Sequence, residues 1–228
     1  MQKTIKSLIL SKKNSQRVAN KNTRPFAGSS LLEIKINQMK RLEAKGLIDG
    51  VVVNSNDEYA LNLAEKMDCE IIKRDNYYCT DEISANELHE HLGRTFSADI
   101  AMFTNTTSPL VSDETLERAI KEYWKNVENG PFDSLNAAHI VKEFLWLDGK
   151  AINYDPDNKP RSQDLPDIFS LDSATDIIDC KKMIECRSFV SKKPYLFLVD
   201  RIEGMEVDWP IDFEITEFLY MKRNGLIK

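Results

Sequence analysis

Hydrophobic and polar residues follow two patterns that alternate along the first 127 residues. Continuous apolar runs predict buried strands, at 7–10, 49–55, 69–74 and 98–107. Between them, apolar residues three and four positions apart predict helices, at 31–46, 57–67, 84–96 and 112–127. Strands that are apolar throughout are typical of a parallel sheet with both faces covered. The pattern therefore predicts an α/β fold.

The regular alternation stops after Phe132. A strand followed by a hairpin is expected next, with Asp148-Gly149 as the turn, because this dipeptide suits the left-handed backbone of a tight hairpin. A polar loop with three prolines follows at 153–167. The remaining elements are predicted to be a strand and a helix within 173–189, a strand at 195–200 and a closing helix at 212–225.

Composition narrows the class of ligand. The chain of 228 residues suits one sizeable α/β domain, and its net charge of -6 argues against nucleic acid or a membrane surface as partner. The four cysteines lack the spacing of a zinc site, so thiols in a reducing compartment are expected. Neither a signal segment nor a membrane-spanning run is recognised. We therefore expect a cytoplasmic protein.

Positive charge gathers near the first predicted strand of this acidic chain. The first acid is Glu33, and seven cations precede it: Lys3, Lys6, Lys12, Lys13, Arg17, Lys21 and Arg24. Ligands of a parallel sheet bind at the carboxyl ends of its strands, where the loop after residue 10 would lie. Several cations without a carboxylate suit a polyphosphate, to which Ser15 and Asn22 add neutral donors. A solvated basic loop is the competing interpretation.

Five segments, taken in order, resemble the CMP-sialic acid synthetases (acylneuraminate cytidylyltransferases). The first is "LILSKKNSQRVANKN" at 8–22, which is similar to the family's strand and basic loop. The other four are "VVVNSNDEYALNLAEKMDCEIIKRDNYYCTDEISA" from Val51, "FTNTTSPL" from Phe103, "KPRSQDLPDIF" from Lys159 and "MEVDWPIDFEITEFL" from Met205. Together they cover nearly the whole chain.

The resemblance implies a Rossmann-like nucleotidyltransferase fold with a mainly parallel central sheet. It also implies CTP binding and attack of a sugar oxygen on the α-phosphate, with release of pyrophosphate. Lys21 matches the catalytic lysine set against the α-phosphate. The matching nucleotide-binding residues are Lys12, Ser15, Asn22, Arg74, Thr80 and Asp81. Gln16 stands where the family often has a lysine, so one phosphate contact is expected to be weaker or to pass to Arg17 or Lys13.

An acidic pair would complete the catalytic machinery. The family shows two aspartates where this chain has Glu206 and Asp208, one as a metal ligand and one as a possible base. Two-residue spacing places both on the same side of a strand. Mg²⁺ prefers such hard oxygen ligands. We expect Glu206 and Asp208 to be catalytic and to bind Mg²⁺, and Asp212 to be the N-cap of the last helix.

The acceptor site departs from the family pattern. Asn105, Arg161, Gln163 and Asp172 are the expected acceptor contacts. Asn105 opens a stretch that differs from the family's Gln-Pro, and Asp172-Ser173-Ala174 stands where Asn-Gly-Ala is common. The extra negative charge at Asp172 indicates an acceptor other than plain N-acetylneuraminate. Another nonulosonic acid, a keto-deoxy sugar acid and a small phosphate or phosphonate all remain open.

The family also implies a homodimer. A small insertion at about 133–193 within the single domain of 1–228 would mediate dimerisation and close the partner's acceptor site. We predict a cytidylyltransferase that converts CTP and a sialic-acid-like nonulosonic acid into a CMP-sugar for surface polysaccharide biosynthesis. Two alternatives remain: the same fold acting on a different acceptor, and a degenerate subunit that binds nucleotide without turnover. His139 is expected to be structural.

Overall fold

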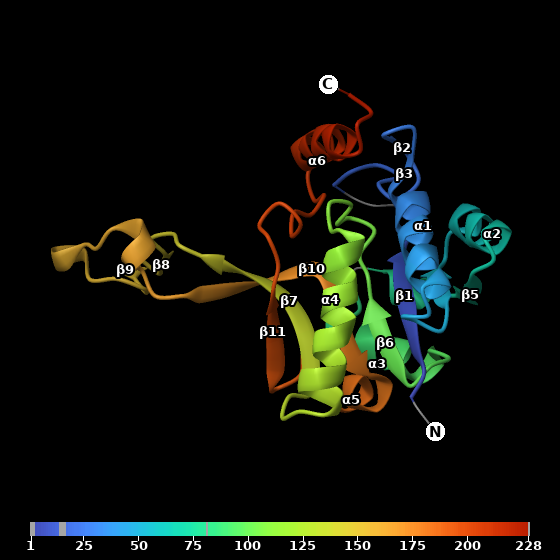
Figure 1. Ribbon diagram of the computed structural model, residues 1–228, viewed down its shortest axis with the longest axis horizontal. Coiled ribbons are helices and arrows are strands. Elements are labelled where there is room, and N and C mark those ends of the chain that lie inside the picture. Colours follow the sequence, from blue (N-terminus) through green and yellow to red (C-terminus); the bar gives the residue numbers. More distant parts are fainter. Residues whose placement is uncertain (1–2, 14–16, 81, 228) are drawn as a thin grey trace.

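A seven-stranded sheet forms the centre of the computed structural model, which describes residues 3–13, 17–80 and 82–227 (Figure 1). The strand order is β11-β7-β10-β6-β1-β4-β5. The strands are β1 (Ile5–Ser11), β4 (Val51–Ser55), β5 (Glu70–Lys73), β6 (Ile100–Phe103), β7 (Ser134–Val141), β10 (Ile168–Asp179) and β11 (Pro194–Leu198). Only β10 is antiparallel to its neighbours β6 and β7, while the other pairs within this described sheet are parallel. The predicted α/β class is confirmed.

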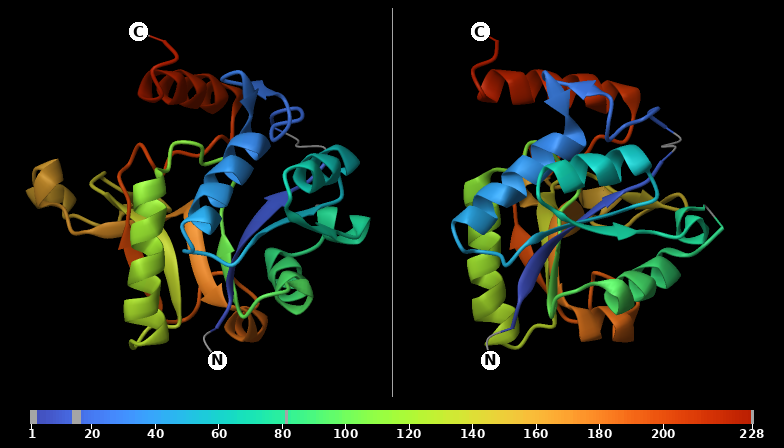
Figure 2. Two further views of the ribbon diagram at one scale, coloured as in Figure 1. Left: turned by 45° about the vertical axis from the view of Figure 1, so that its right-hand side comes forward. Right: turned by 90° about the vertical axis from the view of Figure 1, so that its right-hand side faces the viewer.

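Helices cover both faces of the sheet (Figure 2). On one face lie α1 (Leu31–Ala44), α2 (Glu58–Lys66) and α4 (Asp113–Tyr123), whose apolar residues share a core with Ile9, Val53 and Met102. On the other face α3 (Ala85–Thr95) and α5 (Cys180–Cys186) pack with Leu8 and Val52. Alternate residues of β1 and β4 thus enter different cores, which explains why both strands are apolar throughout.

The chain ends in a third, smaller core. Helix α6 (Pro210–Arg223) packs Phe213 edge-on against Phe26 of the short hairpin β2 (Pro25–Phe26) and β3 (Ser29–Ser30), at 5.2 Å between ring centroids. The prediction that Asp212 is the N-cap is wrong. The helix begins at Pro210, and Asp212 Oδ2 accepts the backbone N–H groups of Asp208 and Trp209 from inside the first turn.

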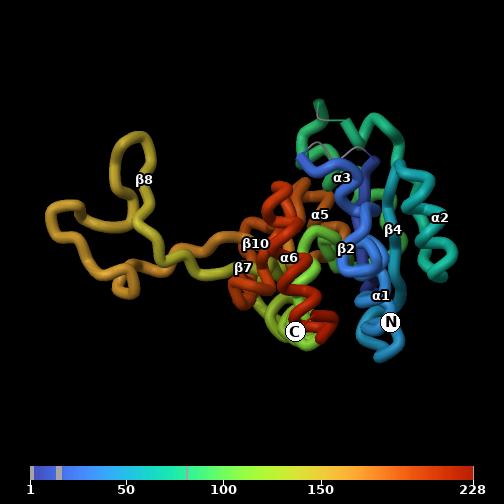
Figure 3. The backbone as a smooth tube through the Cα atoms, turned by 90° about the horizontal axis from the view of Figure 1, so that it is seen from above, coloured from blue at the N-terminus to red at the C-terminus, as the bar shows by residue number. Residues whose placement is uncertain are grey.

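An arm projects from the body between β7 and β10 (Figures 1 and 3). It carries β8 (Trp146–Leu147) and β9 (Lys150–Ala151), and both turn residues between them have positive φ, 49° at Asp148 and 75° at Gly149, which confirms the predicted hairpin. Short helical turns follow at η3 (Pro156–Asn158) and η4 (Ser162–Asp164). Because β7 and β10 belong to the central sheet, the projecting arm spans only 142–167 of the predicted insertion.

Two further helical turns follow regular elements of the fold. A 3-10 turn, η1 (Asn76–Cys79), follows β5. The predicted helix 112–127 continues beyond α4 as a π-helical turn, η2 (Trp124–Glu128), and Ser112 Oγ accepts the N–H of Thr115 as the predicted N-cap. Within the described residues, the helices are all too short or too polar to cross a membrane.

Candidate active site

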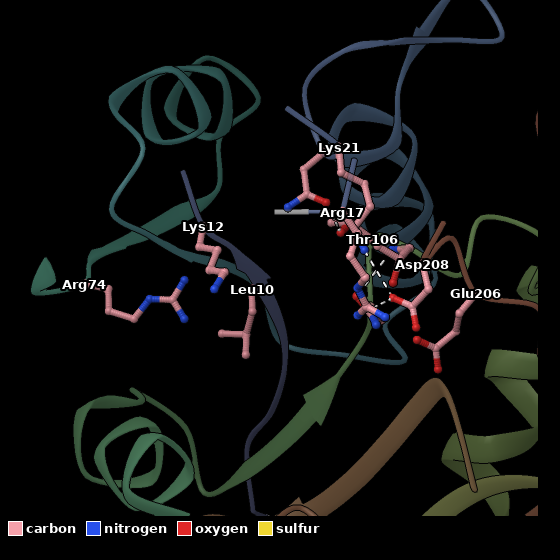
Figure 4. Close-up of a pocket in the computed structure, with 11 residues that line it drawn as sticks. Leu10, Lys12, Arg17, Lys21, Arg74, Thr106, Glu206 and Asp208 are labelled. Carbon is pink, nitrogen blue, oxygen red and sulfur yellow. Dashed lines mark hydrogen bonds and ion pairs between the residues drawn. The ribbon is translucent and has the colours of Figure 1, made fainter. Parts of the chain in front are cut away.

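A cavity of about 490 Å³ opens at the carboxyl ends of the parallel strands (Figure 4). Its walls come from four segments: the loop after β1, the residue after β5, the loop after β6 and the segment before α6. The lining residues are Leu10, Lys12, Arg17, Lys21, Asn22, Arg74, Asn105, Thr106, Thr107, Glu206 and Asp208. Eight of the residues singled out by sequence therefore meet in one cavity: Lys12, Arg17, Lys21, Asn22, Arg74, Asn105, Glu206 and Asp208.

Two cations converge on one carboxylate at one end of this cavity. Arg17 Nη2 lies 2.9 Å from Asp208 Oδ1, and Lys21 Nζ lies 3.5 Å from the same oxygen. Lys21 also donates to the backbone carbonyl of Val207 at 2.7 Å. Burial lowers the pKa of Lys21, and the nearby Asp208 opposes that shift. The Arg17 guanidinium lies over the ring of Trp209, 5.4 Å from its centroid.

Glu206 lies beside Asp208 in the cavity (Figure 4). Its Oε1 accepts the backbone N–H of Ser173 at 2.9 Å. The prediction of a strand at this point is wrong, because residues 206–208 have no ladder partner. The extended segment nonetheless buries Val207 completely and leaves both acids on the cavity wall, which is the placement that two-residue spacing predicts.

Arg74 marks the opposite end of the cavity, with Lys12 nearby (Figure 4). The side chain is 5% exposed, and its Nη2 donates to the carbonyl of Ser11 at 2.7 Å. Burial lowers the pKa of this guanidinium. Its Nε is buried without a hydrogen-bond partner in the described part of the chain. A ligand group that accepts a hydrogen bond would therefore be stabilised here.

Asn22 connects the basic loop by hydrogen bonds to β1 and to the loop after β6. Its Nδ2 donates to Ser11 Oγ at 3.1 Å, and its Oδ1 accepts the hydroxyl of Thr106 at 2.8 Å. Thr106 and Thr107 also line the cavity, although Asn105 is the only expected contact from this loop. Their position directly after a buried strand is the signal that could have identified them.

The remaining nucleotide-binding predictions fall elsewhere. Thr80 does not line the cavity; its hydroxyl donates to the carbonyl of Tyr77 at 2.9 Å and closes the turn η1. Ser15 and Asp81 lie outside the described residues.

The predicted acceptor contacts are divided between the cavity and two other places. Asn105 lines the cavity, but Asp172 is buried behind it, where its carboxylate lies 2.8 Å from His139 Nδ1. Burial raises the pKa of Asp172. Arg161 and Gln163 lie exposed on the arm, and Arg161 forms two hydrogen bonds with Asp164. Within one described chain, Asp172, Arg161 and Gln163 are therefore not lining residues.

An irregularity in β10 explains the place of Asp172. The pairing with β7 shifts between Leu171 and Asp176, so the residues between them bulge out of the ladder. The bulge brings Asp172 against Gly204, where a Cβ would lie 2.7 Å from its Oδ2, and directs Ser173 N–H at Glu206. Gly204 is thus required for close approach, and the bulge orients one of the two predicted catalytic acids.

A mainly parallel sheet whose first strand leads into a basic loop, with carboxylates in the same polar cavity, has the arrangement expected of a nucleotidyltransferase. The sequence model of the cytidylyltransferase family matches residues 7–198, and the chain belongs to this family of enzymes. The resemblance noted from the sequence is confirmed at this level.

Known relatives agree with this assignment. The chain is 22% identical to the post-translational flagellin modification protein B of Campylobacter coli over 95% of its own length and 94% of that protein. Its fold is similar to that of a CMP:2-keto-3-deoxy-manno-octonic acid synthetase complexed with CTP, with a TM-score of 0.69 at 12% identity, covering 96% of this chain and 99% of that one. A 4-diphosphocytidyl-2C-methyl-D-erythritol synthase from Anaerococcus prevotii gives a TM-score of 0.69 at 13% identity, with coverage of 97% and 99%.

Proposed function

We propose that this protein transfers CMP from CTP to a sialic-acid-like nonulosonic acid. The observation that carries the proposal is the convergence of Arg17 and Lys21 on Asp208 inside one cavity, opposite the buried Arg74. Cations grouped around an anion at one end suit the triphosphate. The guanidinium of Arg74, which lines the other end, suits the carbonyl of a pyrimidine base.

The proposed reaction follows from the two ends of the cavity, one with Arg17 and Lys21 and the other with Arg74. An acceptor hydroxyl attacks the α-phosphorus of CTP, the bond from that phosphorus to the β-phosphate oxygen breaks, and pyrophosphate leaves. Lys21 neutralises charge that develops on the α-phosphate in the transition state. A carboxylate of the acidic pair, Glu206 or Asp208, receives the proton of the hydroxyl. The triphosphate takes over Arg17 and Lys21, which now neutralise Asp208.

The acidic pair also suits Mg²⁺. Glu206 uses Oε1 for Ser173 and Asp208 uses Oδ1 for the two cations, so these contacts leave the second oxygen of each carboxylate for a metal ion. Among the described residues no cluster of three or more potential metal ligands occurs, which fits an ion held by one or two carboxylates and by substrate phosphates. Such an ion would offset the negative charge of the triphosphate.

The relatives support a sugar acid as acceptor. One similar structure is named as a synthetase acting on a keto-deoxy sugar acid, and the curated relative is named for flagellin modification. An acid suits a cavity that is lined by the neutral Asn105 and by the cations Lys21 and Arg17. A keto-deoxy sugar acid is the second candidate, favoured by the similarity to that synthetase.

The arm supports a homodimer. Its exposed apolar side chains include Trp146, Leu147 and Ile152, each more than half exposed, at 56%, 62% and 55%. Exposed apolar groups gathered on a projecting segment mark an interaction surface. A second copy of this chain would cover them and bring Arg161 and Gln163 to the neighbouring cavity, where a guanidinium would pair with the acceptor carboxylate.

Pyrophosphate release tests the proposal directly. The purified protein is incubated with Mg²⁺, CTP and one acceptor at a time: N-acetylneuraminate, other nonulosonic acids, keto-deoxy sugar acids and small phosphonates. Each other nucleoside triphosphate serves as control. Release with CTP and a nonulosonic acid supports the proposal, and release with a phosphonate alone contradicts it. Binding of CTP without release across the panel favours a nucleotide-binding subunit without turnover.

A further inference from the structure

Lys35 is a charged residue in the buried stripe of α1. It lies one helical turn from Leu31 and from Met39, and all three side chains are 0% exposed. Removing an ammonium group from water is unfavourable unless partners compensate, so an apolar residue is the ordinary choice at such a position. Burial lowers the pKa of Lys35 to about 7. A lysine here therefore requires a specific explanation.

Two neutral acceptors hold the Lys35 ammonium. It donates to Gln38 Oε1 at 2.8 Å and to the backbone carbonyl of Ser108 at 3.1 Å. Gln38 in turn donates from Nε2 to the carbonyl of Val111 at 2.8 Å and to Asp113 at 3.1 Å. Two side chains on consecutive turns of α1 thus hold both ends of the segment 108–111.

The charged groups around this network are already paired with one another. Arg41 of α1 binds Asp113 of α4 at 2.7 Å. Arg223 of α6 binds Glu203 at 3.3 Å and also donates to the carbonyl of Leu110. The Lys35 ammonium therefore contacts the loop and Gln38 through hydrogen bonds to neutral oxygens. The nearby ion pairs Arg41–Asp113 and Arg223–Glu203 are separate interactions.

The loop held by Lys35 continues into the cavity. Asn105, Thr106 and Thr107 line the cavity immediately before Ser108. The carbonyl of Thr107 accepts the N–H of Val207 at 2.8 Å, and the carbonyl of Val207 accepts Lys21 Nζ at 2.7 Å. One continuous series of hydrogen bonds thus runs from the loop to the segment that carries Glu206 and Asp208.

We propose that Lys35 is a positioning residue of the active site, which holds the loop 104–111 from the core so that Val207 presents its acidic neighbours and the Lys21 ammonium to one cavity. Lys35 does not line the cavity and has no role in contacting substrate. Its effect on turnover rests on the proposed function, whereas its effect on the loop does not depend on which reaction the cavity performs.

Lys35→Met tests the proposal, because methionine keeps the unbranched stem and removes the donor. Lys45→Met, at the exposed end of the same helix, is the matched control. We expect Lys35→Met to lower kcat by about tenfold to a hundredfold with little change in the KM for CTP, since misplaced catalytic groups act on turnover. Amide hydrogen exchange in 104–111 and 205–209 should accelerate about tenfold, and the control should match the wild type.

A folded Lys35→Met protein with wild-type kcat and wild-type exchange overturns the proposal. If that variant does not fold, Lys35→Gln takes its place, because its shorter, uncharged side chain cannot reach both Gln38 and Ser108 as the ammonium group does. Faster exchange in 104–111 then supports the proposal, and unchanged exchange overturns it. A wild-type protein that releases no pyrophosphate contradicts the proposed function, but the exchange comparison still decides the role of Lys35.

Discussion

The loop after β1 and the arm at 142–167 both carry cations, but only the loop turns them inward. Arg17 and Lys21 of the loop face Asp208 inside the cavity. Arg161 of the arm has a 74% exposed side chain and binds its own neighbour Asp164. One chain therefore assembles the cationic end of the cavity by itself, whereas the polar groups of the arm lie outside the cavity. The predictions below test that division.

Lys21→Ala is expected to have the largest effect. Removing the ammonium that would face the α-phosphate should lower kcat by about a hundredfold to a thousandfold. Steady-state pyrophosphate release measures the loss, and circular dichroism checks the fold. Lys66→Ala is the control, because Lys66 is exposed on α2 and does not line the cavity. A Lys21→Ala protein within a few-fold of the wild type would remove the assigned role of this lysine.

Asp208→Asn should have two opposite effects. Turnover should fall by about a hundredfold, because the site loses a proton acceptor or metal ligand. Binding of CTP without added metal should tighten about threefold, because Arg17 and Lys21 no longer pair with a competing carboxylate. Calorimetry in the presence of a chelator measures the second effect, with Glu214→Gln as an exposed control. Weaker metal-free binding in Asp208→Asn would contradict this account.

The arm should affect the acceptor and leave CTP unchanged. Arg161→Ala should raise the acceptor KM by about tenfold or more, since a charged hydrogen bond is lost, while the KM for CTP stays constant. Co-expression with Lys21→Ala provides the sharper test. If Arg161 serves the partner's cavity, each mixed dimer contains one intact site, and about a quarter of wild-type activity should return at low acceptor concentration. If Arg161 serves its own chain, no activity returns.

The last prediction concerns stability. Burial lowers the pKa of Lys35 from its ordinary value of 10.5 to about 7 in the folded protein. Between these values the unfolded chain binds more protons, so the free energy of unfolding should rise with pH from about 7 to 10, by at most about 1.4 kcal/mol per pH unit. Urea unfolding at several pH values measures the slope, which should flatten in Lys35→Met and persist in Lys45→Met. An equal slope in both variants would assign the pH dependence to other groups.

Local pattern was sufficient for most of the elements and for the cations that line the cavity. Val51–Ser55 and Leu31–Ala44 form the strand and helix that their apolar periodicity predicts, because burial on both faces or on one stripe leaves a direct trace in sequence. Lys12, Lys21 and Arg74 follow strands whose carboxyl ends meet at one edge. The predicted acceptor contacts Arg161 and Asp172 were harder to place. They lie on the arm and in the bulge of β10, where the chain no longer alternates regularly between strands and helices.

Local residue patterns specify which segments become strands and helices, where the hairpin turns at Asp148 and Gly149, and which loop holds the cations. These features depend on residues within a few positions of one another. Three other features became visible in the folded chain alone. Antiparallel β10 enters the sheet between β6 and β7, and its bulge supports Glu206. Buried Lys35 lies beneath the Ser108 loop. These features depend on contacts between distant segments, for which the spacing of residue types carries no signal.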